Sequence, residues 1–374
     1  MKQGWEIKKL GEVCEILDHL RVPITKKDRR EGCYPYYGAS GVQDYIDSYI
    51  FDGRYLLVGE DGAKWGANDK SAYIIEGKSW VNNHAHILKI NDCLSDKLVE
   101  YYLVAKDLQE FITGAIVPKL TQQALKNIPI PVPPLPVQEQ IVSELDLLSG
   151  IIEKKHEQLK ELDALAQSIF YDMFGDPITN EKGWEVKKLG EVCDDITDGD
   201  HMPPPKSETG IPFLTISDID KEKRELNFND TFFVPQEYYD NLKENRRAKK
   251  GDVLYTVTGS YGIPVIVNTC KHFCFQRHIA LLKPKQENLL SLFLCQWFLC
   301  EGVKFMADQV ATGIAQKTVS LTSIRKFEII LPPLPLQHQF ATKIEAIEKQ
   351  KELIKQSISE TETLFNERMQ EHFG

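Results

Sequence analysis

The sequence predicts an α+β protein: two mixed α/β globular domains, a long antiparallel two-helix coiled coil that separates them, and a pseudo-two-fold internal duplication. Two observations carry this prediction. A segment near the start returns almost unchanged near the middle, and a proline-rich segment ahead of an apolar heptad pattern also occurs twice. The sequence between these anchors mixes short strand-like runs with glycine-rich turns, which is typical of small sheets.

The duplication is visible residue by residue. Residues 4–14 read GWEIKKLGEVC and residues 183–193 read GWEVKKLGEVC, so only Ile7 and Val186 differ. Agreement of this length does not arise by chance, and ordered self-similarity marks a repeated architecture. Further matches are residues 132–138 (VPPLPVQ) with 331–337 (LPPLPLQ), Thr113-Gly114 with Thr312-Gly313, and Phe174-Gly175 with Phe373-Gly374. We therefore divide the chain into a first variable domain (1–136), a first conserved helical region (137–175), a second variable domain (176–335) and a second conserved helical region (336–374).

Each conserved region predicts one long helix. A proline cluster precedes each region, and proline suits the first turn of a helix. Apolar residues then recur at alternating spacings of four and three, which indicates a coiled-coil seam. Lys155 alone breaks the first seam, and the second seam weakens towards its end. The first seam is Ile141, Leu145, Leu148, Ile152, Lys155, Leu159, Leu162, Ala166, Ile169 and Met173; the second is Phe340, Ile344, Ile347, Lys351, Ile354, Ile358, Thr361, Phe365, Arg368 and His372.

The short connection after the first helix predicts how the helices pair. Residues 176–182 span at most about 25 Å, so the second variable domain must begin near the end of the first helix. The same domain leads into the start of the second helix, which favours antiparallel pairing with one variable domain at each end of a rod. Each helix of about 34 residues would be roughly 50 Å long. The plainer alternative is a coiled coil that serves only as a dimer seam.

Composition favours an intracellular globular protein. The 374 residues are 42% hydrophobic and 27% charged, long enough for two domains with separate cores. The sequence shows no signal-peptide pattern and no apolar run of about 18 residues, so we expect a cytoplasmic protein without a membrane partner. The net charge of −10 argues against DNA binding at first sight. However, residues 1–140 carry 17 basic and 19 acidic side chains and residues 176–336 carry 20 and 22, which leaves a local basic face open.

Sequence motifs for metal, nucleotide or catalytic chemistry are weak. The eight cysteines include no CxxC pair, so we expect buried, reduced thiols and no metal site. The alternative, suggested by the spacing of Cys270 and Cys274, is a zinc site. The glycine-rich turns at 59–66 and 258–262 match neither GxxxxGK[ST] nor GxGxxG. His84 and His278 recur at similar places, which points first to a structural hydrogen bond.

A catalytic role is not expected either. Met202-Pro203-Pro204-Pro205 lacks the leading Asn or Asp of a methylase motif, and there is no convincing nuclease carboxylate cluster. Asp198, Asp200 and His201 imitate a metal site but precede a proline-rich turn.

Loop side chains with hydrogen-bond donors are the candidates for DNA contact, because such groups reach phosphates or base edges. For any one of them, a solvated surface side chain is an equally good explanation, so the set is the prediction. The candidates are Lys26, Lys27, Arg29, Arg30, Lys64, Lys119 and Gln122 in the first domain, and Lys206, Ser217, Tyr261, Gln276, Arg277, Gln316 and Lys317 in the second.

The tandem GWE(I/V)KKLGEVC openings, with PPLPVQEQ and PPLPLQHQ ahead of long helices, resemble the type I restriction–modification specificity subunit. The stretches LTQQALKNIPIPVPPLP (120–136) and TGIAQKTVSLTSIRK (312–326) share this resemblance, which covers essentially the whole chain. One departure is His338, where the family usually has Glu, as at Glu139; we expect it to weaken one helix start.

The resemblance implies a sequence-specific DNA-recognition subunit without catalysis of its own. Each variable segment would be a target recognition domain that reads one half of a bipartite asymmetric DNA target. The helices would set the spacer and dock two methyltransferase (modification) subunits, which restriction/translocase subunits join. S-adenosylmethionine, ATP and magnesium would bind on those partners, and no cofactor on this chain. The alternative is a coiled-coil scaffold or interaction protein without DNA-sequence specificity.

Overall fold

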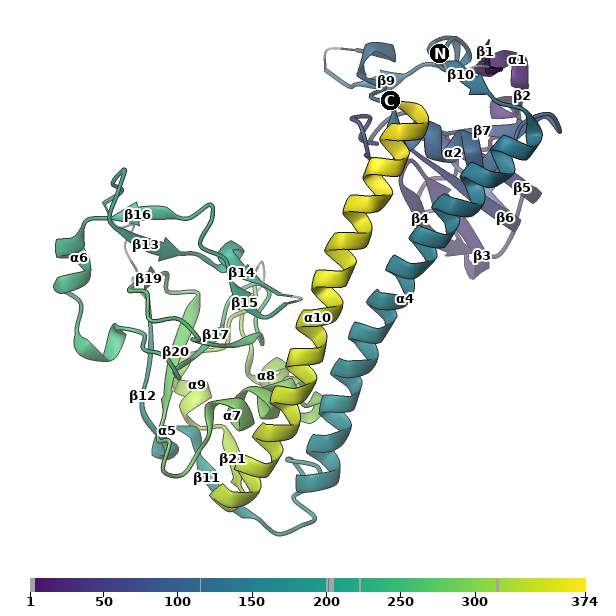
Figure 1. The fold of residues 1–374 in the computed structure, drawn as a ribbon. Coiled ribbons are helices and arrows are strands. Elements are labelled where there is room, and N and C mark those ends of the chain that lie inside the picture. Colours follow the sequence, from purple (N-terminus) through teal and green to yellow (C-terminus); the bar gives the residue numbers. More distant parts are fainter. Residues whose placement is uncertain (1–3, 115, 200, 202–204, 222, 314–315) are drawn as a thin grey trace. The chain divides into compact units, whose positions relative to one another are not determined.

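The chain forms two compact units, which divide both long helices. The first unit is Met1–His156 with Lys355–Gly374, and the second is Glu157–Ile354. The computed structural model (Figure 1) describes residues 4–114, 116–199, 201, 205–221, 223–313 and 316–374. Each unit therefore combines one variable domain with a segment of each helix.

The first unit is built on a six-stranded sheet of order β2-β7-β5-β6-β3-β4. The apolar runs at 50–58 and 84–88 contribute to its central strands, and α2 (Asp96–Ala105) packs on β5 and β6. The strands are β2 (Cys14–Ile16), β3 (Glu31–Gly38), β4 (Gly41–Ile46), β5 (Phe51–Gly59), β6 (Ala72–Val81) and β7 (Ala85–Ile90), followed by the hairpin β8 (Ile112–Thr113) and β9 (Lys119–Leu120) and by helix α3 (Gln122–Lys126).

The second unit has a four-stranded sheet, β12-β20-β17-β18, and a three-stranded sheet, β16-β13-β19. Helix α7 (Ser291–Leu299) packs against β18, and α8 (Glu301–Val310) follows it. The strands are β12 (Cys193–Asp198), β13 (Ile211–Leu214), β14 (Ile219–Asp220), β15 (Glu225–Leu226), β16 (Phe232–Val234), β17 (Val253–Thr256), β18 (Pro264–Ile266), β19 (Cys274–Phe275) and β20 (Ile279–Pro284), and the short helices are α6 (Gln236–Asp240) and α9 (Leu321–Arg325).

The repeated segments form the same small motif in both units. The opening repeat gives a strand and one helical turn: β1 (Glu6–Lys9) with α1 (Leu10–Val13), and β11 (Glu185–Lys188) with α5 (Leu189–Val192). These strands pair antiparallel with β10 (Pro129–Val132) and β21 (Glu328–Leu331), just ahead of the proline clusters. Leu10 and Leu189 are fully buried. The two repeated anchors thus close each variable domain at its base, which explains why they match while the intervening sequences differ.

The long helices are α4 (Leu135–Phe174) and α10 (Leu334–Phe373), each of 40 residues. They are longer than the 34 residues expected, about 60 Å each. They start earlier because Pro136 and Pro335 lie in the first turn, where a missing N–H breaks no helical hydrogen bond.

A buried glutamine fixes the start of each helix. The Gln138 amide accepts a hydrogen bond from Ser95 N (2.8 Å) and donates to Cys93 O and Pro133 O. Gln337 repeats this with Leu290 N (2.9 Å), Asn288 O and Pro332 O. His338 is exposed and α10 begins at Leu334, ahead of it; the weakening of this helix start by His338 stays a prediction.

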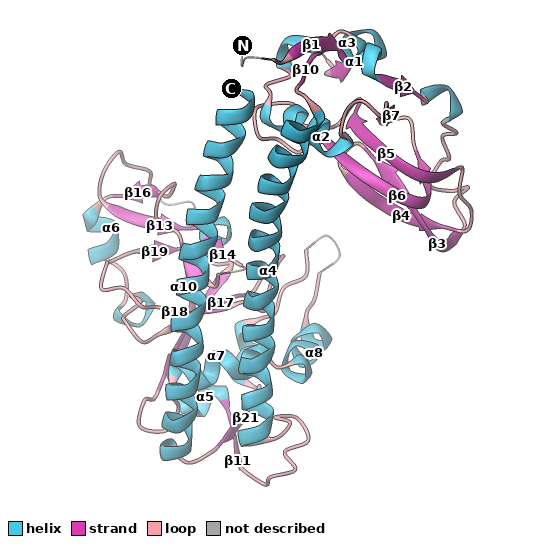
Figure 2. Ribbon diagram, turned by 45° about the vertical axis from the view of Figure 1, so that its right-hand side comes forward, coloured by secondary structure: helices cyan, strands magenta, loops and turns pink. Residues whose placement is uncertain are grey.

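Within each unit, the segments of α4 and α10 lie side by side and run antiparallel (Figure 2). In the first unit Glu144 contacts Arg368 and Lys155 contacts Ser357. In the second unit Asp163 contacts Lys351, and Phe170 packs on Phe340. The partner number falls as the α4 number rises, which confirms antiparallel pairing.

The predicted seam is correct in the N-terminal part of each helix, where Ile141 and Leu145 of α4 and Phe340 and Ile344 of α10 are buried, and it is wrong towards the C-terminal ends. Phe170, Phe174 and Met369 are buried in place of Ile169, Met173 and Arg368. The reason is that a straight helix has 3.6 residues per turn and drifts from a heptad, and Phe170 and Phe174 instead pack on Phe293 of α7.

Each helix also carries one lysine in its apolar seam. Lys155 donates from Nζ to the Ser357 carbonyl and hydroxyl and to Thr361 Oγ1 (2.8 Å). Buried Lys351 binds Asp163 (2.9 Å) and Glu348 (3.0 Å). A satisfied polar group in a seam penalises other registers.

All eight cysteines are free; five are buried, but Cys33, Cys93 and Cys270 are exposed, so the expected burial was wrong for these three. Among the described residues, no helix combines the length and apolar character needed to cross a membrane.

Candidate nucleic-acid interface

Three segments of the first unit converge beside the C-terminal end of β5. We call them the first loop cluster: residues 60–64, 82–86 and 112–120, of which 115 lies outside the described residues. Glu60 N donates to His84 O (2.8 Å), and Leu120 N donates to Glu60 O (2.8 Å). Asp61 and Lys119 form a β-bridge. These bonds fix the glycine-rich turn, the turn before β7 and the β8–β9 hairpin against one another.

The second unit repeats this backbone frame. Its second loop cluster is residues 257–261, 276–280 and 312–318, of which 314 and 315 lie outside the described residues. Val257 N donates to His278 O (2.9 Å), Val319 N donates to Val257 O (2.9 Å), and Thr258 bridges Thr318. Each bond has its counterpart in the first loop cluster, although the sequences there share little.

One glycine in each hairpin explains the repeated Thr-Gly pair. Gly114 and Gly313 have φ values of +94° and +120°, which glycine alone adopts readily. A Cβ on Gly114 would lie 2.4 Å from Val117 O, and one on Gly313 would lie 2.2 Å from Gln316 O. Both hairpins therefore need glycine for conformation and for space. The same contacts make Val117 and Gln316 equivalent positions.

The side chains on the shared frame differ in kind. Equivalent backbone bonds and strand register match Glu60 with Val257, His86 with Ala280, and Lys119 with Thr318. The first cluster thus encloses ionisable groups where the second has apolar or neutral ones.

The ionisable groups of the first cluster form a network that is buried apart from Lys119, whose side chain is 43% exposed. Lys119 Nζ lies 2.7 Å from Glu60 Oε1, and Arg21 pairs with the other Glu60 oxygen. Asp18 accepts hydrogen bonds from Ile87 N (3.0 Å) and Gln122 Nε2 (3.1 Å). The network joins the β2–β3 connection, the end of β5 and the base of the hairpin.

His86 lies at the centre of this network and is fully buried. Its Nδ1 is 2.6 Å from Asp18 Oδ2 and its Nε2 is 2.7 Å from the Leu120 carbonyl oxygen. Both neighbours are hydrogen-bond acceptors, so each ring nitrogen is placed to donate a hydrogen bond to one of them.

Asp18, Glu60 and His86 lie close enough together to be metal ligands. The network does not suit a cation, because His86 uses both nitrogens as donors and Arg21 and Lys119 already neutralise the carboxylates. Burial is the largest single influence and would raise the pKa of Asp18 and of Glu60. Hydrogen bonds and charges together outweigh it, from His86, the Ile87 N–H and Arg21 on Asp18 and from Lys119, Arg21 and His86 on Glu60, so both pKa values stay below their ordinary range. The hydrogen bond to Glu60 raises the pKa of Lys119.

In the second unit the equivalent aspartate, Asp198, has different partners: it lies 2.9 Å from His201 and 3.6 Å from Arg246. Asp200, the third member of the metal-like sequence cluster, lies outside the described residues. His84 pairs with Asp61, whereas Arg277 donates to His278 Nε2 at 3.4 Å. Burial, and then the charge of Arg277, lowers the pKa of His278. The structural interpretation of these two histidines therefore fits, with a different partner in each unit.

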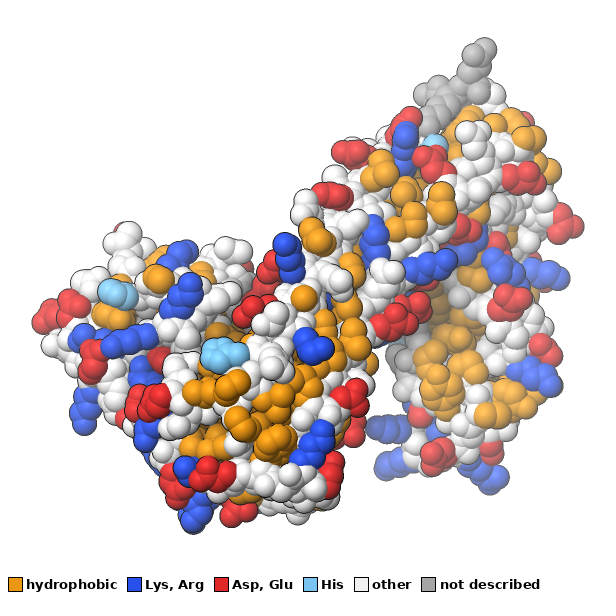
Figure 3. All heavy atoms as spheres, turned by 60° about the horizontal axis from the view of Figure 1, so that its bottom comes forward, with side chains coloured by type: hydrophobic (Ala, Val, Ile, Leu, Met, Phe, Trp, Pro, Cys, Tyr) orange, Lys and Arg blue, Asp and Glu red, His pale blue; other side chains and the backbone are white. Residues whose placement is uncertain are grey.

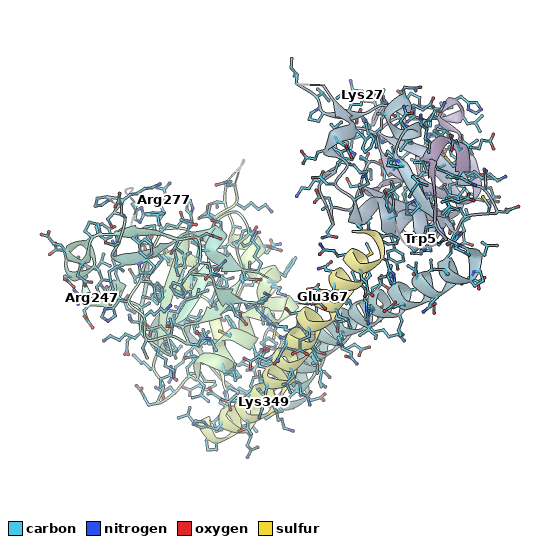
Figure 4. All side chains as sticks on the ribbon, turned by 45° about the horizontal axis from the view of Figure 1, so that its top comes forward. Trp5, Lys27, Arg247, Arg277, Lys349 and Glu367 are labelled. Atoms are coloured by element: carbon cyan, nitrogen blue, oxygen red, sulfur yellow. The ribbon has the colours of Figure 1, made fainter. Side chains whose placement is uncertain are left out.

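The structure brings together some of the predicted DNA-contact residues of the first unit. Lys64 and Lys119 lie in the first loop cluster, and Gln122 follows it. The Lys119 ammonium group binds the Glu60 carboxylate, and the Gln122 side-chain amide donates a hydrogen bond to Asp18. Arg29 binds Asp44 (3.2 Å) and lies over the Tyr36 ring, in a loop where Lys26, Lys27 and Arg30 are exposed. Figure 4 shows Lys27 at the surface of this unit.

In the second unit, Tyr261, Gln276, Arg277, Gln316 and Lys317 all fall in the second loop cluster. Arg277, Gln316 and Lys317 are exposed (Figure 4 labels Arg277). Tyr261 donates its hydroxyl to Asp308 (2.7 Å), and this bond raises the pKa of Tyr261. Ser217 pairs with Thr215, and Lys206 lies over the Phe232 ring of the three-stranded sheet, so Lys206 belongs to a different region.

Sequence reasoning missed Asp18, Arg21, Glu60 and His86. A signal was present for one: Glu60 directly follows the apolar run of β5 and its glycine. On the face drawn in Figure 3, lysine and arginine side chains are interspersed with aspartate and glutamate, in keeping with the near-neutral domains counted from the sequence.

The fold and the duplicated loop clusters define the class of protein. The chain belongs to the family described as "Type I restriction modification DNA specificity domain", which matches residues 2–164 and 181–363. It is therefore a DNA sequence-recognition subunit of a type I restriction–modification complex, a non-catalytic component that assembles with the other subunits and binds DNA. The scaffold alternative without DNA specificity is not favoured.

Particular relatives extend over most of the chain. A putative type I restriction enzyme specificity subunit of Haemophilus influenzae is 29% identical over 352 residues, covering 92% of this chain and 87% of its own. The MjaVIII specificity subunit of Methanocaldococcus jannaschii is 22% identical, covering 92% and 86%. The solved S subunit from M. genitalium shares the fold, with a TM-score of 0.55 and 13% identity over 98% of this chain and 95% of that one.

Proposed function

We propose that the two loop clusters read the two unlike halves of a bipartite DNA target, one cluster for each half. The observation that carries this proposal is the shared backbone frame with different side chains. A common frame gives both halves one docking geometry, while the side chains set the bases that each half accepts. Because exposed equivalent positions also differ, with Val117 in one hairpin and Gln316 in the other, the halves are expected to differ, unlike the palindrome of a homodimer.

The paired helices would dock the modification subunits. In the second unit a groove of about 480 Å³ lies on the helix pair, and Leu165 and Leu353 on it are 47% and 60% exposed. In the first unit Leu147 and Leu364 are 65% and 41% exposed on the same helices. Exposed apolar residues on paired helices favour a protein partner. The groove is lined by Gln158, Glu161, Leu162, Leu165, Gln350, Leu353 and Ile354.

Two methyltransferase subunits fit this duplication, one for each unit, and restriction/translocase subunits would join them. In this proposal S-adenosylmethionine, ATP and magnesium bind on those partners. The chain contributes the choice of site and the spacing between half-sites.

Domain exchange tests the proposal. Residues 1–136 are replaced by the matching segment of another specificity subunit, and methylated sites are mapped at base resolution in cells that also express the methyltransferase. One half of the split motif should change completely, while the other half is retained because residues 176–335 are untouched. The matched control exchanges residues 176–335 and should change the opposite half. A single exchange that altered both halves would contradict the two-reader assignment.

A further inference from the structure

The β8–β9 hairpin of the first unit ends in an exposed apolar tip. Ile116 is 95% exposed and Val117 is 63% exposed, and Pro118 follows them. Ile116 is the most exposed of the large hydrophobic side chains that the structure describes. These two exposed β-branched side chains contribute no hydrophobic stabilisation to the fold, because their apolar surface stays in water.

The tip also lacks charge. Residues 112–118 include no Lys, Arg, His, Asp or Glu. The nearest cation along the chain is Lys119, whose Nζ lies 2.7 Å from Glu60 Oε1. The tip therefore offers DNA no ammonium or guanidinium group for a phosphate, and its own contribution to binding is apolar.

The equivalent hairpin of the second unit carries the opposite chemistry. Gln316, the counterpart of Val117, and Lys317 are both exposed, so this tip presents an amide and an ammonium. The two hairpins share one backbone frame but differ in the polarity of their tips, and this polarity decides how each would contact DNA.

The first hairpin is held firmly at its base. The network beneath it fixes Lys119 through Glu60, the Leu120 carbonyl through His86, and Gln122 through Asp18. Gly114 adds a tight turn against the Val117 carbonyl. A hairpin whose base is fixed in this way loses less conformational entropy when its tip is inserted between other groups.

We propose that Ile116 and Val117 form an apolar wedge that inserts into the base stack of the first half-site. This inference rests on the proposed function, since it assumes that the first loop cluster meets DNA. Apolar wedges of this kind partly unstack a base step, and the bent duplex offsets that cost because it covers more of the protein surface. In the second half-site, Gln316 and Lys317 contact the DNA as polar groups without insertion.

Salt dependence tests the chemistry of the wedge. The assembled complex of the full chain with its methyltransferase is bound to a duplex carrying the motif found by methylation mapping, over a range of salt concentrations. The double variant Ile116→Ser/Val117→Ser should bind about tenfold or more weakly at every salt concentration, with an unchanged slope of log affinity against log salt because no phosphate contact is lost. The matched control Ile7→Ser, at an apolar position of β1 that is 49% exposed, should bind like the parent.

A mismatch scan tests insertion itself. Single mismatches are placed through the first half-site, because a mismatched pair already has a lower unstacking cost. At the wedge step, a mismatch should strengthen binding by the parent and have a smaller effect on the double variant. Unchanged affinity of the double variant, or equal mismatch effects for both proteins throughout the half-site, would overturn the wedge. If no split motif depends on this chain, the proposed function itself fails, and that result is seen before any duplex is made.

Discussion

The two loop clusters use one backbone frame in two physical ways. The first holds its hairpin with a largely buried network of two carboxylates, an arginine, a lysine and a histidine ring. The second holds its hairpin with Val257, Ala280 and Thr318 at the equivalent positions and keeps its lysine, Lys317, exposed. Backbone hydrogen bonds therefore define the frame, whereas the groups packed beneath it decide which cations remain available to a ligand.

Breaking the network should have the largest effect. Glu60→Val, which introduces the residue of the second unit, removes the partner of both Arg21 and Lys119. Removing one partner of a buried ion pair leaves an uncompensated charge, so we expect the first unit to lose about 3 kcal/mol of stability. Hydrogen exchange of the full chain would measure this loss, with peptides of the second unit as the reference within the same molecule.

A combined exchange provides the control. Glu60→Val/His86→Ala/Lys119→Thr gives the first cluster the side chains of the second and removes the charges together. It should cost less than the sum of the three single substitutions, because coupled charges are not additive. Additive costs would mean that the groups act independently and that the network has no collective role.

The next largest effect should be a difference between the two clusters in their loss of stability at low pH. The native pKa values of Asp18 and Glu60 are lowered, so their stabilisation is complete above the ordinary carboxyl pKa of about 4. It is lost as the pH falls through the lowered native values. After correction for intrinsic exchange rates, peptides of the first loop cluster should lose protection between about pH 5 and pH 2 by more than those of the second. Equal losses in both clusters, or a first cluster that resists acid better, would contradict this role of the carboxylates.

The smallest expected effect concerns the two hairpin lysines. Lys317→Gln should weaken DNA binding a few-fold and reduce the salt slope by about 0.9, the value for one lost phosphate contact. Lys119→Gln should leave the slope unchanged, since that ammonium already binds Glu60. Binding isotherms at several salt concentrations distinguish these results, and a reduced slope for Lys119→Gln would show that this lysine reaches phosphate.

Local patterns in the sequence predicted much of the fold. The GWE(I/V)KKLGEVC repeat, the proline clusters and the apolar seam are short-range signals, and they predicted the duplication and the paired helices. The helix ends were less predictable, because Phe170 and Phe174 are buried by Phe293, a residue distant in the sequence. Lys351 is likewise held in the seam by Asp163 on the other helix.

The candidate site was predicted as a set of loops and not as a set of contacts. Lys119 and Gln122 look like free donors in the sequence, and only the fold brings Glu60 and Asp18 to them. Arg29 likewise meets Asp44 and Tyr36 through the β3–β4 hairpin. Equivalences such as His86 with Ala280 depend on strand register, which the diverged sequences do not reveal.

Base-resolution methylation mapping tests the central claim most directly. DNA is compared from cells that express this chain with its methyltransferase and from cells that express the methyltransferase alone. The two-reader account predicts a split motif with two short, unlike halves at a fixed spacing, which disappears when this chain is absent. Methylation that is unchanged without this chain would contradict the claim that its two loop clusters choose the methylated site.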